Sequence, residues 1–160
     1  MVVSAGHQHH AALVPHVDAL RQIADDIDQL TPQQIAGRLA EELTFIHEQL
    51  LPHLEMAERT LYPHLERLLE DPQGMDPMRR EHAEVHRLLE RLASYQASLG
   101  GGSIVLRDEL ALRRILYRLF SLMRVHLHEE EHYLAIIDRH EGAADVAGLR
   151  EAMEHAVVTT

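Results

Sequence analysis

Two pairs of residues in this chain have a spacing that suits metal binding. His126 and Glu130 are four residues apart, and His82 and His86 have the same separation. On an α-helix, residues four apart lie on one face, so each pair can direct two side chains at one ion. Imidazole combined with carboxylate suits iron, and also zinc or manganese. These pairs therefore predict a metal site with nitrogen and oxygen ligands.

A third segment adds a histidine followed by two carboxylates. In the run HLEMAE, His53 precedes Glu55 by two residues and Glu58 by five. Either carboxylate could bridge two ions if the segment is helical, and Glu58 is the one that we include in the ligand set. Pro52 is expected to kink this helix, as Pro15 is expected to kink the first one.

The pairing of helices predicts that four histidines share one level. In an antiparallel helix pair, residues equally far from the connecting turn lie at the same height. His10 and His53 are almost symmetrical about Thr31, and His82 and His126 bracket a glycine-rich break. We therefore expect one imidazole from each of four helices in the interior. Burying them without a metal or hydrogen bonds would cost free energy.

Breaks in the helical pattern define the elements that must hold these side chains. Thr31 followed by Pro32 is typical of a helix start, and Asp71 followed by Pro72 of a helix end. Three consecutive glycines and a Glu-Gly pair mark two further breaks. We expect one all-α domain over residues 1–160, an up-down-up-down four-helix bundle. Its helices are predicted at about 7–29, 32–70, 77–99 and 104–140, with a short C-terminal helix at 143–156.

Composition argues against several other kinds of protein. The chain has no cysteine, which excludes disulfides, thiolate zinc sites and iron–sulfur clusters. Its formal net charge of −11 disfavours binding to nucleic acid and to anionic membranes. No apolar stretch is long enough for a membrane span, and the first residues lack the pattern of a signal peptide. We therefore expect a soluble, cytoplasmic protein.

Together these motifs resemble one family, the hemerythrin-like domains, also called HHE cation-binding domains. The resemblance covers about residues 7–140 and rests on HAAL at 10–13, LPHLEMAE at 51–58 with LYP at 61–63, REH at 80–82 and VHLHEEE at 125–131. It implies a four-helix bundle around a non-haem di-iron centre. Members of this family take up O2 or related small molecules, or serve iron and redox handling.

The resemblance implies two iron ions bridged by an oxo group or a carboxylate, with zinc or manganese as alternatives. The expected ligands are His10, His53, Glu58, His82, His86, His126 and Glu130. The chain departs from the family at Ala57, where a carboxylate usually follows the second-helix histidine by four residues. Glu58 or Glu55 is expected to take that role. Tyr62 is expected to pack in the core, although its phenol, one turn beyond Glu58, could reach the metals.

The first helix leaves three histidines open as ligands. The distance from Thr31 favours His10, while His9 is adjacent to it and His16 follows a proline. We treat His16 as an alternate ligand or as a residue that supports the ligands. The other interpretation of His9, together with His7, is a mobile His-rich terminus.

The function that we expect is the binding of O2, peroxide or nitric oxide for carriage, sensing or redox protection. An enzyme of this kind would be a peroxide-consuming or other di-iron oxidoreductase. The alternative is an iron-binding or zinc-binding storage module, or an acidic helical protein that binds a basic partner without redox chemistry. The redox partner and the oligomeric state do not follow from the sequence.

Overall fold

The computed structural model describes residues 2–99, 106–140, 147–149 and 151, and these contain no β-strand. The elements in chain order are α1 (Val2–Asp26), α2 (Pro32–Phe45), η1 (Ile46–Leu50), α3 (Leu51–Met56), η2 (Ala57–Leu61), α4 (Tyr62–Leu68), α5 (Asp76–Leu99) and α6 (Leu106–His140). The prediction of an all-α chain is confirmed.

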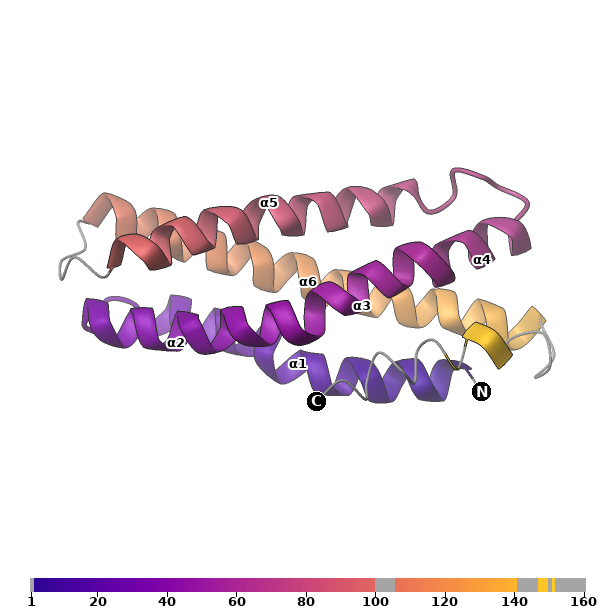
Figure 1. The fold of residues 1–160 in the computed structure, drawn as a ribbon, viewed down its shortest axis with the longest axis horizontal. Coiled ribbons are helices and arrows are strands. Elements are labelled where there is room, and N and C mark those ends of the chain that lie inside the picture. Colours follow the sequence, from indigo (N-terminus) through magenta and orange to yellow (C-terminus); the bar gives the residue numbers. More distant parts are fainter. Residues whose placement is uncertain (1, 100–105, 141–146, 150, 152–160) are drawn as a thin grey trace.

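Four long rods run alternately in opposite directions (Figure 1). The first is α1, the second runs from α2 through η1, α3 and η2 to α4, and the third and fourth are α5 and α6. The fourth rod packs along both α1 and α5, and α2 also packs against α5. This is the up-down-up-down arrangement that short connections favour.

The helix boundaries differ from the prediction by a few residues. The first helix occupies Val2–Asp26 rather than 7–29, and the second rod ends at Leu68 rather than at residue 70. Glu70 has a left-handed φ of 52°, which cannot continue a right-handed helix. The Asp71 amide donates a hydrogen bond to the carbonyl of Glu66, as in a Schellman motif. Of the helix predicted at 143–156, residues 147–149 and 151 are helical, and the rest lie outside the described residues.

The start of the second rod follows the predicted capping pattern. The Thr31 hydroxyl accepts a hydrogen bond from the Gln34 amide, and the Gln34 side chain accepts one from the Thr31 amide. Pro32 occupies the first turn, where a missing N–H costs nothing. Two otherwise unpaired groups are thereby satisfied, which fixes the start of this rod.

The second rod is continuous but contains two wide π-helical turns, η1 and η2. In each, a backbone hydrogen bond spans five residues: Leu51 N–H donates to the carbonyl of Ile46, and Tyr62 N–H to that of Ala57. A proline follows each of these donors. A proline ring clashes with the carbonyl four residues earlier, and a wider turn relieves that clash. Figure 1 shows the rod changing direction around α3.

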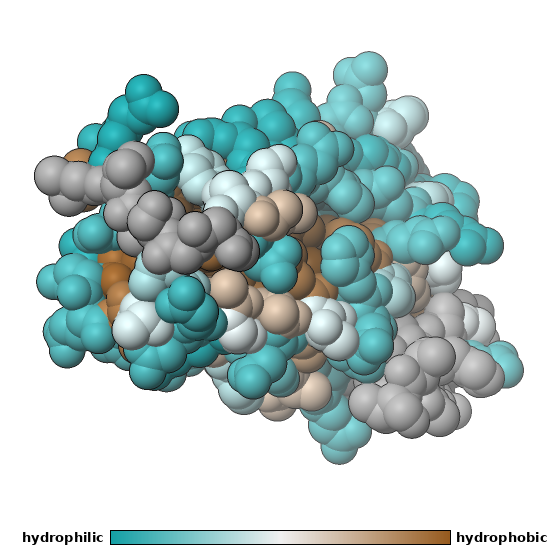
Figure 2. All heavy atoms as spheres, turned by 60° about the vertical axis from the view of Figure 1, so that its left-hand side comes forward, coloured by the Kyte–Doolittle hydropathy of each residue, from teal (hydrophilic) through white to brown (hydrophobic). Residues whose placement is uncertain are grey.

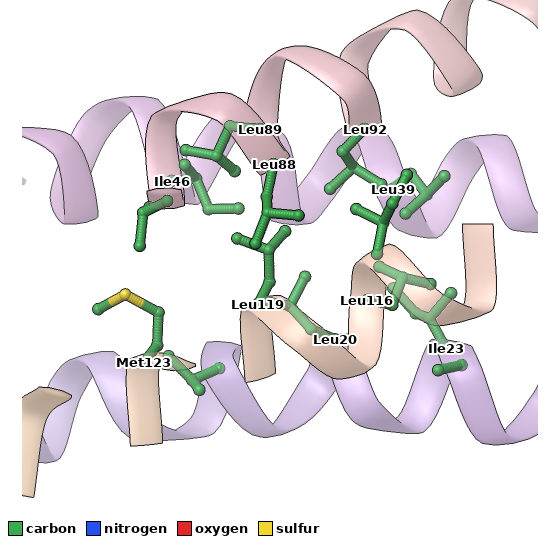
Figure 3. Packing of buried hydrophobic residues seen from close by; sticks show 14 of the residues in the cluster. Leu20, Ile23, Leu39, Ile46, Leu88, Leu89, Leu92, Leu116, Leu119 and Met123 are labelled. Atoms are coloured by element: carbon green, nitrogen blue, oxygen red, sulfur yellow. The ribbon is translucent and has the colours of Figure 1, made fainter. Parts of the chain in front are cut away.

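Apolar side chains form two clusters inside the bundle. In the larger cluster, leucines from all four rods interdigitate, among them Leu20, Leu39, Leu88 and Leu119 (Figure 3). The smaller cluster contains Leu65, Met78, Leu134 and Ile137 among others. The face of the molecule in Figure 2 is mainly hydrophilic, with hydrophobic side chains visible between hydrophilic ones across its middle. Among the described residues, no helix has the length and apolar character needed to cross a membrane.

Candidate metal centre

Six buried polar side chains form a layer between the two apolar clusters. They are between 0 and 2% exposed, and they are His9, His10, His53, His82, His126 and Glu130. Along α6, the layer separates Met123 of the larger cluster from Leu134 of the smaller one. Polar groups buried in this way cost free energy unless they pair with one another or bind an ion.

Glu130 lies at the centre of this layer, and its two carboxylate oxygens face different side chains. Oε2 is 3.2 Å from Nε2 of His10 and 3.0 Å from Nε2 of His53. Oε1 accepts a 2.9 Å hydrogen bond from the Tyr62 hydroxyl and lies 3.5 Å from Nε2 of His126. One carboxylate therefore joins two separate groups of histidines.

His82 and His126 face each other through their Nε2 atoms, which are 3.1 Å apart. On the other side of each ring, Nδ1 of His82 lies 2.8 Å from a Glu58 oxygen and Nδ1 of His126 lies 2.9 Å from a Glu81 oxygen. A neutral imidazole that donates from Nδ1 to a carboxylate presents a lone pair at Nε2. Two facing lone pairs require a cation between them, either a proton or a metal ion.

In the metal-free layer, that cation is a proton. Burial lowers the pKa of His126, but the carboxylates of Glu130 and Glu81 outweigh burial and raise it to about 9. Burial and the neighbouring charge of His126 lower the pKa of His82 to about 4. Burial opposes the charge on Glu130, yet its electrostatic interaction with His53 and hydrogen bonds from His10 and His126 hold the Glu130 pKa well below its usual range. Metal binding here would displace a proton from His126.

The histidines on the other side of Glu130 leave several nitrogens without hydrogen bonds. Among the described residues, both ring nitrogens of His53 and Nδ1 of His10 lack a hydrogen-bond partner. Nε2 of His53 is close to Glu130 but is not aligned for a hydrogen bond. Burial lowers the pKa of His53, which favours its neutral form. Each unmade hydrogen bond costs on the order of 1–3 kcal/mol, and coordination to a metal ion would remove that cost.

Tyr62 brings a hydroxyl into the layer one wide turn beyond Ala57. Both residues are fully buried, and the backbone hydrogen bond between them belongs to η2. The Tyr62 hydroxyl donates to Glu130 and also lies 2.9 Å from Nε2 of His82. Burial and the charge of Glu130 raise the pKa of Tyr62, so it is a neutral donor. The expectation that Tyr62 packs in the core is therefore incomplete, since its polar end belongs to the site.

Neither of the two carboxylates expected to replace the one missing at Ala57 lies between the histidines. The Glu58 side chain is 44% exposed and meets His82 at Nδ1 rather than at Nε2. The Glu55 side chain is 68% exposed and pairs with Arg59 on the surface. The five-residue step from His53 carries Glu58 toward the rim of the layer. The bridging position expected for Glu58 is thus corrected to one beside His82.

Two other expected ligands, His86 and His16, also lie outside the layer. His86 is exposed, because the buried face of α5 continues through Val85 instead. His16 contacts a Glu42 oxygen through Nδ1 at 3.1 Å, and its ring stacks on Phe45 with centroids 3.6 Å apart. Burial raises the pKa of Glu42, and the contact with His16 opposes that shift. The structure therefore places His86 and His16 away from both groups of potential ligands.

His9 also belongs to the layer, although the sequence favoured His10 as the first-helix ligand and left His9 as an alternative. It is 2% exposed, and its ring centroid lies 4.8 Å from that of His53. The alternative of a mobile terminus is wrong for His9, whereas His7 is exposed. Helical periodicity could have identified it, since His9 precedes the core residue Leu13 by four positions, as His10 does by three. Burial, and then the electrostatic effect of the neighbouring His53 and His10 rings, lowers the pKa of His9 to about 4.

The layer contains two groups of side chains that fit a metal ion. One is formed by His10, His53 and Glu130 and the other by His82, His126 and Glu130, and in each the ligand atoms lie within 4.8 Å of one another. Two imidazoles with one carboxylate form a set that holds non-haem ferrous iron and leaves coordination positions open. Since Glu130 belongs to both groups, the residues present fit two neighbouring ions.

Comparison with protein families matches residues 1–137 of the chain to the hemerythrin HHE cation binding domain. The matched segment contains all six residues of the buried layer. No match was found to a curated protein or to a solved structure.

Proposed function

Because the chain belongs to the hemerythrin HHE cation-binding domain family, we propose that its buried layer holds two non-haem iron ions. The proposed role of this centre is to bind O2 or a related small molecule, such as peroxide or nitric oxide. Such binding would serve carriage, sensing or protection against reactive oxygen species. Membership of this family implies that the chain binds cations. We propose in addition that it binds two ions and a small-molecule ligand.

The observation that supports two ions most directly is the position of Glu130. Its Oε2 lies near His10 and His53, and its Oε1 lies on the side of His126. A carboxylate that bound a single ion would not need imidazoles around both oxygens. Each side would hold one ion through two imidazoles and one oxygen of the shared carboxylate.

The surrounding residues prepare this layer for a small ligand. Glu58 and Glu81 accept from Nδ1 of His82 and His126, which orients both rings with Nε2 toward the interior. The ligand groups are at most 1% exposed, and apolar side chains lie on both sides of them. This burial excludes water and bulky substrates. Bound ferrous iron would supply electrons and an open position for a molecule as small as O2.

Metal analysis combined with visible spectroscopy tests this function. Protein from iron-supplemented cells is expected to contain two iron atoms per chain by plasma emission. After anaerobic reduction, admission of air is expected to produce a charge-transfer band in the visible or near-ultraviolet spectrum. If the protein binds two iron ions but its spectrum does not respond to O2, peroxide or nitric oxide, the proposed metal centre stands and the proposed small-molecule binding is wrong. A colourless protein that carries zinc would contradict the proposal.

A further inference from the structure

The structure contains a histidine nitrogen that neither hydrogen bonding nor the two ligand groups explain. Nε2 of His9 is buried and has no hydrogen-bond partner among the described residues. The side chain is 2% exposed, although its neighbour His7 on the same helix is exposed. An imidazole nitrogen is a good hydrogen-bonding group, so its burial without a partner calls for a different kind of partner.

The position of the His9 ring fits an ion shared with His10 and His53. The three ring centroids are separated by 4.8 Å (His9 to His53), 5.3 Å (His10 to His53) and 6.3 Å (His9 to His10). With metal–nitrogen bonds of about 2.0–2.1 Å, two imidazoles on one ion have centroids about 4.5–6.4 Å apart, depending on the angle between them. All three separations fall within this interval. The facing pair His82 and His126, at 4.7 Å, falls within it as well.

The groups around His9 also suit a ligand. Its neighbours in the layer are the imidazoles of His10 and His53, and the carboxylate of Glu130 lies beside both of those rings. The ring is therefore surrounded by groups that would themselves bind the same cation. Adjacent positions on a helix point about 100° apart, so His9 and His10 can approach one ion from two directions.

We infer that His9 is a metal ligand and completes a group of three imidazoles with His10 and His53. This inference rests on the proposed dinuclear centre and adds to it a ligand outside the two groups described above. The ion beside His82 and His126 would have only two imidazoles. The two positions are thus unequal, and the one with three imidazoles is expected to bind nitrogen-preferring divalent metals more tightly.

Cobalt(II) titration of the metal-free full-length chain tests this inference. His9→Phe keeps a ring of similar size beside His53 but removes Nε2, and His7→Phe is the matched control at an exposed position of the same helix. The wild-type chain and His7→Phe are each expected to bind two Co2+ ions, one more tightly than the other, and the two dissociation constants of His7→Phe should match those of the wild type. In His9→Phe, one of the two dissociation constants is expected to rise by at least roughly 10–100-fold. The metal-free melting temperature of His9→Phe should equal or exceed that of the wild type, because an unpaired buried nitrogen has been removed.

The outcomes separate the inference from the proposed function. If the wild type binds two ions and His9→Phe binds both with unchanged affinity, His9 is a packing residue and the inference is wrong. If the wild type binds fewer than two ions, the proposed dinuclear centre fails, and the inference fails with it. If the variant does not fold, an NMR measurement on the wild type alone still tests the inference. The NMR spectrum of the cobalt protein should show metal-shifted imidazole signals from His9, and their absence while those of His10 and His53 are present would overturn the inference.

Discussion

The Nε2 atoms of His82 and His126 face each other across 3.1 Å, and each ring is anchored on its far side by a carboxylate. This arrangement determines what the layer can hold. With both Nδ1 atoms committed to Glu58 and Glu81, the two Nε2 atoms can share one cation but cannot both be donors to each other. A proton satisfies this requirement in the metal-free chain, and an ion that also contacts Glu130 would satisfy it more completely.

The stability of the metal-free chain is expected to be greatest near pH 6.5. The pKa of His126 is raised from 6.5 to about 9 in the folded state, so its stabilising effect is fully present below pH 6.5 and is lost as the pH rises to 9. The pKa values of His9 and His82 are lowered from 6.5 to about 4, so stability is also lost as the pH falls through that interval. Urea unfolding in the presence of a chelator should show a fall on the order of a few kcal/mol on each side.

Urea unfolding at the same pH values with metal present provides the comparison for this prediction. A bound ion replaces the proton on His126 and keeps the other imidazoles neutral, so the loss of stability between pH 6.5 and 9 is expected to disappear. A metal-free chain whose stability is constant from pH 4 to 9 would contradict the charge distribution assigned to the layer.

Replacing Glu58 tests whether this carboxylate orients His82 or binds metal itself. Glu58→Gln removes the charge from the acceptor at Nδ1 and is expected to weaken metal binding by roughly 10–100-fold without changing the number of ions bound. Glu55→Gln is the matched control, because Glu55 is more exposed than Glu58 and pairs with Arg59 on the surface. Isothermal titration with ferrous iron under anaerobic conditions measures both quantities. Loss of one ion per chain in Glu58→Gln would instead show that Glu58 is a ligand.

Much of the site could be predicted because helix spacing and turn position depend on local sequence. The symmetry of His10 and His53 about Thr31 correctly placed the two rings in one layer, where their centroids are 5.3 Å apart. The same reasoning placed His82 opposite His126. For the first pair the prediction needed only the helix rise and a turn with clear capping residues, and for the second pair the helix rise and the position of a glycine-rich break.

The remaining differences arise from features that spacing alone does not specify. Glu58 was expected to bridge two ions, but the wide turn η2 begins at Ala57 and shifts every later side chain around the rod, bringing Tyr62 into the layer. His86 was expected to share a face with His82 because it lies four residues further along the helix. The buried residues of α5 are instead spaced by steps of three and four, and the step from His82 leads to Val85. Pro63 explains why a wide turn forms in this part of the rod. The exact position of that turn depends on packing against the other helices.

Removing the Tyr62 hydroxyl is expected to destabilise the metal-free chain. Tyr62→Phe leaves Oε1 of Glu130 without its 2.9 Å donor while keeping the packing of the ring. We expect the free energy of unfolding in a chelator to fall by about 1–3 kcal/mol. Tyr95→Phe is the control, since Tyr95 packs against the larger apolar cluster and not in the layer. Equal stabilities of the two variants would mean that the hydrogen bond to Glu130 contributes nothing measurable.

Replacing Glu130 should have the largest effect on metal content, because this side chain belongs to both groups of ligands. A glutamine has almost the same shape but no negative charge, and its amide nitrogen cannot coordinate a cation as a carboxylate oxygen does. We expect Glu130→Gln to retain less than one iron per chain and to lose most of the rise in melting temperature that iron gives the wild type. That rise corresponds to about 2.7 kcal/mol when the free metal is at 100 times the dissociation constant. Glu129→Gln, at the neighbouring and partly exposed position of α6, should behave as the wild type in plasma emission and in thermal unfolding. Two tightly bound ions in Glu130→Gln would show that this carboxylate does not join the two histidine groups through a metal.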